Sequence, residues 1–250
     1  MRKEWILGVV VLVGACASAR PPAASEMQPI PDAAAIDARV AQVMARTGAK
    51  GLALAVIDDG QVAYVHAYGA RNAKGDPLGS GTVMYGASLT KTVVAYTVMR
   101  LVDQGRIALD TPLADDLDKP LPDYDPEAIF PDKYGPYRDL ADDPRWKAIT
   151  PRMVLTHSTG FANFAWLEPD HKLRIHFDPG SRYAYSGEGF ILLQFAIDNG
   201  RRAQGLGVDL GEVARTNVFE PLGMTRTSLV WRDDFAGNLA DGWNAQGEAK

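Results

Sequence analysis

The 250-residue sequence contains only one cysteine and four histidines, which excludes several common kinds of site. A single cysteine rules out an intrachain disulfide. No two histidines have the i, i+4 spacing of a zinc site on a helix, and no further cysteines are present to complete one. The sequence also has no glycine-rich phosphate loop and no calcium-binding loop. We therefore expect neither a metal ion nor an organic cofactor.

An excess of positive charge is missing as well. The 26 Lys and Arg residues are outnumbered by 31 Asp and Glu residues, so the formal net charge is −5. No run of like charges forms an acidic or basic tail. Because proteins that bind nucleic acid present a basic patch, we expect no nucleic-acid partner. An apolar content of 46% is ordinary for a globular protein, and a chain of this length can bury a sizeable core.

The apolar run at the start of the chain, Ile6–Val13, is too short to span a bilayer. It follows Arg2 and Lys3 and precedes a stretch of small residues, which is the layout of a secretory signal. Val13–Cys16 resembles a bacterial lipobox, which would make Cys16 a lipid-modified N-terminus. Ala17–Ala19 fits ordinary signal cleavage, which would release an unanchored protein. We favour the lipoprotein because the sole cysteine occupies the lipobox position.

These features divide the chain into three parts. Residues 1–19 are the predicted signal peptide, and residues 20–31, rich in Pro, Ala and Ser, are a predicted tether. Residues 32–250 form the predicted domain. The protein is thus expected outside the cytoplasm, in the periplasm or beyond the cell, with membrane anchoring through Cys16.

The domain begins with patterns typical of a helix and a hairpin. Ala33–Arg46 has helical apolar spacing after Asp32, a plausible N-cap. The apolar stretches Gly51–Ile57 and Gln61–Tyr68 flank Asp58–Gly60, a good hairpin turn. A helix followed by a buried antiparallel hairpin predicts an α+β fold.

Further elements are predicted along the rest of the chain. The helix that starts near Ser88 and ends at Gly105 is apolar nearly all round, so we expect it to be buried. The region 109–149 lacks periodicity and is predicted to be an irregular connection with short helices, of the kind that often forms a lid or binding rim. We also predict helices over 150–155, 191–197 and 209–218, and a strand that starts within 225–230.

Ser88 and Lys91 are three positions apart, and on a helix they would stand on one face. A serine hydroxyl is a weak nucleophile without an adjacent base. A lysine one turn away can act as that base when its surroundings disfavour the ammonium form. Taken alone, the spacing is common, and a capping serine followed by a solvated lysine is the simpler interpretation.

Several ordered motifs change that interpretation. Ser88–Lys91, Arg106–Leu113, Leu155–Gly160, Pro179–Gly187 and Glu220–Met224 together resemble the serine beta-lactamase-related hydrolases. That group includes class C beta-lactamases, D-alanyl-D-alanine carboxypeptidases and family VIII-type esterases. The resemblance implies a beta-lactamase/transpeptidase-like α+β fold, with an antiparallel sheet flanked by helices and a mainly helical subdomain.

The resemblance also assigns roles to residues. It implies that Ser88 is the acylated nucleophile, that Lys91 helps to deprotonate it, and that Tyr185 is the tyrosine of a Tyr-x-Asn motif. A phenol beside an ammonium group is stabilised as phenolate, so Tyr185 can relay protons to the leaving group and later activate water. Tyr183 is the rival tyrosine, interpreted as packing. His157 is a rival base, but Ser88 lacks the second glycine of a Gly-x-Ser-x-Gly elbow, and the family implies a structural role.

Two departures from the family pattern stand out. Ser186 and Gly187 occupy the substrate-binding part of the Tyr-x-Asn motif, and Gly187 replaces the asparagine whose side chain would bond the lysine and a substrate amide. Residues 225–250 contain no Lys-Thr-Gly or His-x-Gly motif, which should supply one oxyanion-hole N–H. Losing such a donor costs roughly a hundredfold to a thousandfold in rate. We interpret the chain as a C-terminally truncated member whose last strands are missing.

Two functions remain open on this basis. The first is a serine hydrolase that cleaves an ester, amide or lactam bond of a small molecule or peptide through an acyl-serine intermediate. Esterase or D-amino-acid peptidase activity is favoured over efficient beta-lactamase activity because of Gly187. The alternative is an inactive cell-envelope binding module built on the same scaffold.

Overall fold

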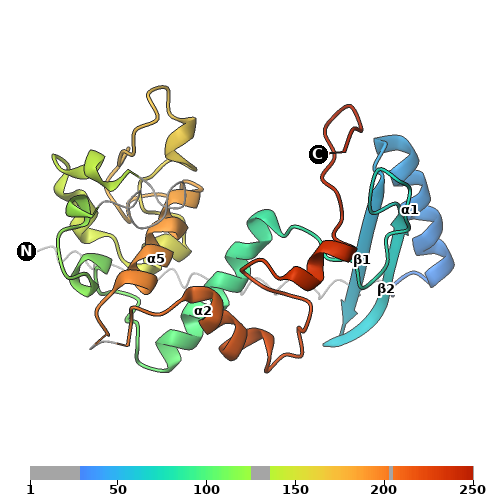
Figure 1. The fold of residues 1–250 in the computed structure, drawn as a ribbon, viewed down its shortest axis with the longest axis horizontal. Helices are drawn as coiled ribbons and strands as arrows, with labels where there is room; N and C mark the ends of the chain where they lie inside the picture. Colours follow the sequence, from blue (N-terminus) through green and yellow to red (C-terminus); the bar gives the residue numbers. More distant parts are fainter. Residues whose placement is uncertain (1–28, 125–135, 203–204, 250) are drawn as a thin grey trace, which may run out of the picture. The chain divides into compact units, whose positions relative to one another are not determined.

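A computed structural model describes residues 29–124, 136–202 and 205–249. The predicted signal peptide, Cys16 and most of the predicted tether lie outside these residues. The chain divides into two compact units, one made of residues up to 49 together with 54–66, and the other of 50–53 together with 67–250. Figure 1 shows the elements of each unit. None of the described helices is both long and apolar enough to cross a membrane.

The first unit begins with the helix α1, Ala33–Thr47, close to its predicted bounds. The Asp32 side chain caps it by accepting a hydrogen bond from the Ala35 N–H at 2.8 Å. Gly48 ends it in the left-handed region, with φ of 71°. The cap and the terminal glycine confirm what the sequence pattern predicts.

The two strands that follow α1 also form where predicted. Strand β1 spans Gly51–Asp58 and strand β2 spans Gln61–Gly69, and they pair as a two-stranded sheet. Asp59 and Gly60 both have positive φ, which is the geometry of a tight hairpin turn and makes the strands antiparallel. The phenol of Tyr64 donates a hydrogen bond to Asp37 of α1 at 2.5 Å, which ties the hairpin to the helix.

In the second unit, a short 3-10 helix, η1 (Ala87–Leu89), runs into α2, Thr90–Asp103. The prediction that this helix is buried all round is wrong. One face is buried through Val94, Thr97, Val98 and Leu101. Tyr96 and Met99 on another face are 49% and 39% exposed. The helix therefore has a one-sided core contact, which leaves its first turn accessible.

The region 109–149 is irregular, as predicted, and the helix α4, Pro151–Leu155, follows it. Its described 3-10 helices are η2 (Leu113–Asp116), η3 (Leu121–Asp123), η4 (Tyr137–Leu140) and η5 (Pro144–Ala148). Another short helix, η6, spans Ala165–Leu167. These segments pack around α5, Gly187–Asn199, as Figure 1 shows. Leu193 and Phe195 of α5 are fully buried, so α5 forms the centre of this core.

The last part of the chain contains α6 (Leu210–Ala214), a π-helical turn η8 (Arg215–Phe219) and η9 (Asp233–Asn238). The strand predicted within 225–230 is wrong, because that stretch forms turns and bends. Backbone pairing occurs later in the chain, where Val83 bonds residues 238 and 240.

Candidate active site

Ser88 and Lys91 meet at the junction of η1 and α2. The Lys91 Nζ donates a hydrogen bond to the Ser88 Oγ at 3.3 Å. Ser88 is exposed, whereas Lys91 is half-buried. The short 3-10 turn followed directly by α2 keeps the two side chains on one face, as the spacing predicts. The contact places an amine against an exposed hydroxyl, and a serine needs a neighbouring group of this kind to act as a nucleophile.

The backbone just before the serine is strained. Ala87 has φ of 43°, in the left-handed region that residues other than glycine rarely adopt. Such a conformation costs roughly 1–2 kcal/mol for an L-residue. Strained backbone of this kind concentrates at functional sites, where the surrounding structure holds a side chain in place. Here it fixes the direction in which Ser88 leaves the turn.

This strain gives a testable expectation. Ala87→Gly should change the free energy of unfolding by less than about 1 kcal/mol, because relieved strain is offset by the added freedom of glycine in the unfolded chain. Labelling of Ser88 by a fluorophosphonate should slow by about fivefold, because the serine is held less firmly. Asp59→Gly is the matched control, since Asp59 also has positive φ but lies in the hairpin turn. Equal labelling rates in both variants would contradict the positioning role.

Tyr185 completes the cluster. The Lys91 Nζ lies 4.9 Å from the centre of the Tyr185 ring and 5.8 Å from that of Phe190. Hydrogen bonding to Lys91 and to Ser88, together with the nearby Lys91 charge, lowers the pKa of the Tyr185 phenol. The rival, Tyr183, presents its ring to His157 instead, with ring centres 5.8 Å apart. The structure thus brings Ser88, Lys91 and Tyr185 together.

His157 contacts the Tyr185 side of this cluster. Its ring lies against that of Tyr185, with centres 4.4 Å apart, and its Nδ1 accepts a hydrogen bond from the Ser186 N–H at 3.1 Å. The His157 carbonyl accepts a second bond from the Ala184 N–H at 2.8 Å. Burial, and secondarily the Lys91 charge, lowers the pKa of His157, so it is neutral at pH 7. Bonds on both sides of Tyr185 identify His157 as a positioning residue for that tyrosine.

Ser186 and Gly187 have roles that the sequence did not indicate. The buried Ser186 hydroxyl donates to the Ala162 carbonyl at 2.8 Å and accepts from the Gly189 N–H at 3.0 Å, so it caps α5. The Gly187 N–H donates to the carbonyl and to the side-chain oxygen of Asn163, at 2.8 and 3.0 Å. The loop that carries Asn163 is thereby fastened to the start of α5.

Glu188 fastens the same loop and was missed by sequence reasoning. It is only 4% exposed, and its Oε1 accepts a hydrogen bond from the Ala165 N–H at 2.7 Å. Burial raises the pKa of this carboxyl group. A glutamate in the first turn of a helix gives no sequence signal for such a distant contact.

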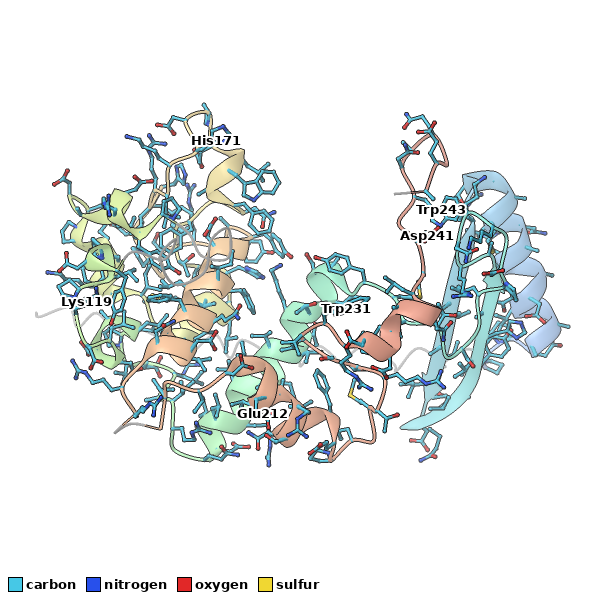
Figure 2. The ribbon with its side chains drawn as sticks, viewed as in Figure 1. Lys119, His171, Glu212, Trp231, Asp241 and Trp243 are labelled. Carbon is cyan, nitrogen blue, oxygen red and sulfur yellow. The ribbon has the colours of Figure 1, made fainter. Side chains whose placement is uncertain are left out.

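A cavity of about 970 Å³ lies beside the start of α2. Its walls include Met84, Leu89, Val93, Trp231 and Asp241, of which the last two are labelled in Figure 2. Gly86, Leu89 and Thr90, which flank Ser88 in the sequence, also line this cavity, whereas Ser88, Lys91 and Tyr185 do not. Within the described ranges, no group of His, Cys, Asp or Glu residues is arranged to hold a metal ion.

Comparison with known proteins gives the family. The family model described as Beta-lactamase matches residues 36–250. The chain is 27% identical over 170 residues to acyltransferase calJ of Penicillium decumbens, which covers 60% of this chain and 38% of that protein. It is 29% identical over 187 residues to lovastatin esterase of Penicillium rubens, covering 64% of this chain and 43% of that protein.

A solved structure gives the same fold. The octameric penicillin-binding protein homologue from Pyrococcus abyssi has a TM-score of 0.64 and 23% identity, over 88% of this chain and 50% of that one. The chain spans less than half the length of the two curated relatives above and half the length of this structure. Since the family model covers most of the chain, the protein belongs to the beta-lactamase family of serine hydrolases and has its beta-lactamase/transpeptidase-like fold.

Proposed function

We propose that the protein cleaves an ester, amide or lactam bond through an acyl-enzyme formed on Ser88. The observation that carries the proposal is the cluster in which Lys91 bonds the Ser88 hydroxyl and the Tyr185 phenol has a lowered pKa. The Ser88 Oγ attacks the carbonyl carbon and gives its proton to this pair. The same pair returns the proton to the leaving group, and a water molecule then attacks the acyl ester to regenerate the serine.

The start of the helix suits the developing negative charge on the substrate oxygen. Backbone N–H groups in the first turn of a helix lack partners within the helix. In the described chain, the Leu89 N–H bonds the Gly86 carbonyl and the Thr90 N–H bonds the carbonyls of Ala87 and Ser88. Following the family resemblance, we assign the N–H of Ser88, in the turn that leads into α2, to the oxyanion hole.

Among the three carbonyl classes, we propose an ester as the substrate. Relatives named as an acyltransferase and as an esterase both handle acyl groups, and these names support the proposal at the level of reaction class. Gly187 offers no side-chain amide to bind the polar acylamino group of a peptide or lactam. A strained lactam still tests whether Ser88 is a competent nucleophile. When the ring opens, the leaving group stays attached to the acyl group, so the whole lactam remains on the protein as an adduct.

The test is the intact mass of the chain after exposure to a fluorophosphonate, to a p-nitrophenyl ester and to benzylpenicillin in separate samples. One adduct, located by peptide mapping on the segment that contains Ser88, is expected from the fluorophosphonate and the ester. A chain that is folded by circular dichroism yet forms no adduct would contradict the proposal. If that chain also bound cell-wall peptides, the inactive binding module would replace it.

We also propose that the protein is exported and anchored by lipid on Cys16. The support is the arrangement of a basic start, an apolar run and a lone cysteine within small residues. Expressed in a bacterium with a clickable palmitate analogue, the chain should take up the label and fractionate with membranes. Cys16→Ala should lose both properties. An unlabelled mature protein that begins at Arg20 would contradict the lipid anchor and leave simple secretion.

A further inference from the structure

The absence of a side chain at Gly187 has a specific cause in this structure. A Cβ atom built on Gly187 would come within 2.5 and 2.8 Å of two ring carbons of Phe164, and within 2.9 Å of the Asn163 carbonyl oxygen. A Cβ atom essentially never approaches another heavy atom this closely without a shift of one of them. The space in which a residue at 187 would place its side chain is already filled by the Phe164 ring.

That space adjoins the segment that carries Tyr185. Ser186, between the two residues, has an extended backbone, with φ of −139° and ψ of 122°. The Cα atoms on either side of one extended residue are roughly 7 Å apart, which keeps Gly187 close to Tyr185. Tyr185, whose ring centre lies 4.9 Å from the Lys91 Nζ, is only two residues before Gly187, so the Phe164 ring packs against the segment that carries this tyrosine.

The phenylalanine ring is part of a larger apolar surface. Phe164 and Trp166 are stacked, with ring centres 5.3 Å apart and planes inclined by 14°. Trp166 is 62% exposed and the adjacent Leu167 is 56% exposed, so the surface reaches outward from the cluster. Two anchors hold the loop that carries these side chains: the Asn163 bonds to Gly187 and the bond of Glu188 to the Ala165 N–H. The aromatic pair is therefore a supported surface on a fastened loop.

From this geometry, we infer that Phe164, backed by Trp166, is the acyl-binding wall of the site and selects esters whose acyl group is apolar. An acyl chain attached to Ser88 would lie along the stacked rings and bury its methylene groups there. An acyl chain with an amide at the same depth would lose its water partners and find an aromatic ring in their place. The inference rests on the proposed acyl-enzyme and adds the class of acyl group to it.

The experiment compares two esters with the same leaving group. p-Nitrophenyl hexanoate and p-nitrophenyl 3-acetamidopropanoate have acyl chains of equal length, but the second carries an amide in the chain. The rate of p-nitrophenol release in the acylation phase gives a ratio for the two esters. In the wild-type chain, the hexanoate should react about tenfold faster or more. Phe164→Ala should reduce this ratio about tenfold, while Phe164→Leu, which keeps an apolar wall, should hold it within about threefold.

The outcomes separate the inference from the proposed function. If the wild-type chain is folded and reacts with neither ester nor fluorophosphonate, the acyl-enzyme itself is overturned. If it is acylated at Ser88 but Phe164→Ala leaves the ratio unchanged, only the acyl-binding wall is overturned. A ratio that falls equally in Phe164→Leu would also overturn it, because the effect would then come from disturbance of the loop.

A thermal-melting cycle tests the geometry without any activity. Gly187→Ala in the wild-type background should lower the melting temperature by about 5 °C, because the new methyl group overlaps Phe164. In the Phe164→Ala background, the same change should cost less than half as much, the remainder being the approach to the Asn163 carbonyl. Equal losses in the two backgrounds would show that the ring does not fill this space.

Discussion

Replacing Ser88 by alanine is expected to abolish covalent labelling of the chain by a fluorophosphonate and by p-nitrophenyl esters. A fluorophosphonate reacts much faster with a serine whose proton is removed by a neighbouring base than with an ordinary hydroxyl group. Among the hydrogen bonds of the described chain, Lys91 Nζ donates to the Ser88 Oγ at 3.3 Å. Intact-mass spectrometry should show the full adduct in the wild type and less than about one part in a thousand in Ser88→Ala, a loss within the range for removing a triad serine.

The matched control for this change is Ser80→Ala. Ser80 is an exposed serine eight positions earlier in the chain, so its loss tests whether any accessible hydroxyl is labelled. We expect Ser80→Ala to be labelled at the wild-type rate. Labelling that persists in Ser88→Ala and maps to another serine would assign the role of nucleophile to that serine instead. Labelling lost in both variants would indicate that the adduct depends on the fold of this region and not on one hydroxyl.

Local signals in the sequence were sufficient for most of the elements. Asp32 and Thr150 cap helices as their residue types predict, and the Asp-Gly turn gives the hairpin and its register. The strand predicted within 225–230 does not form, because a strand depends on an available partner that the local pattern does not encode. The prediction that α2 is buried all round was wrong for a related reason. The apolar composition of a helix does not show which of its faces the core will cover.

Some residues of the candidate site could be predicted from the sequence and others could not. The pair Ser88 and Lys91 depends on spacing within one turn, so the sequence alone brings it together. Tyr185 required the family resemblance, because nearly one hundred residues separate it from the serine. The ring of Phe164 in the space beside Gly187 had no sequence signal at all. From the sequence, Gly187 could be interpreted only as the replacement of an asparagine. In the structure, its lack of a side chain leaves room for an aromatic ring.

The second large effect is expected from Lys91→Met. A methionine has a similar length but neither charge nor a proton-accepting nitrogen, so the acylation rate at pH 7 should fall roughly 100-fold to 10,000-fold. The pH dependence should move as well. Hydrogen bonding to Lys91 holds the pKa of Tyr185 below its ordinary value of 10.0. Without Lys91, the pKa of the phenol rises, less phenolate is present at any given pH, and the rising limb of the rate profile shifts to higher pH.

Lys91→Arg separates the two roles that Lys91 can play. Arginine keeps the positive charge that favours the Tyr185 phenolate but stays protonated at every accessible pH, so it cannot accept the serine proton. If Lys91 is the base, Lys91→Arg should be as slow as Lys91→Met at every pH, because arginine cannot accept the serine proton. If Tyr185 is the base and Lys91 only stabilises the phenolate, Lys91→Arg should retain much of the rate, and Tyr185→Phe should then be the slower variant. Acylation rates measured from pH 6 to pH 10 in all three variants distinguish these results. Wild-type rates in Lys91→Met would contradict both, because the 3.3 Å contact with Ser88 would then have no part in the chemistry.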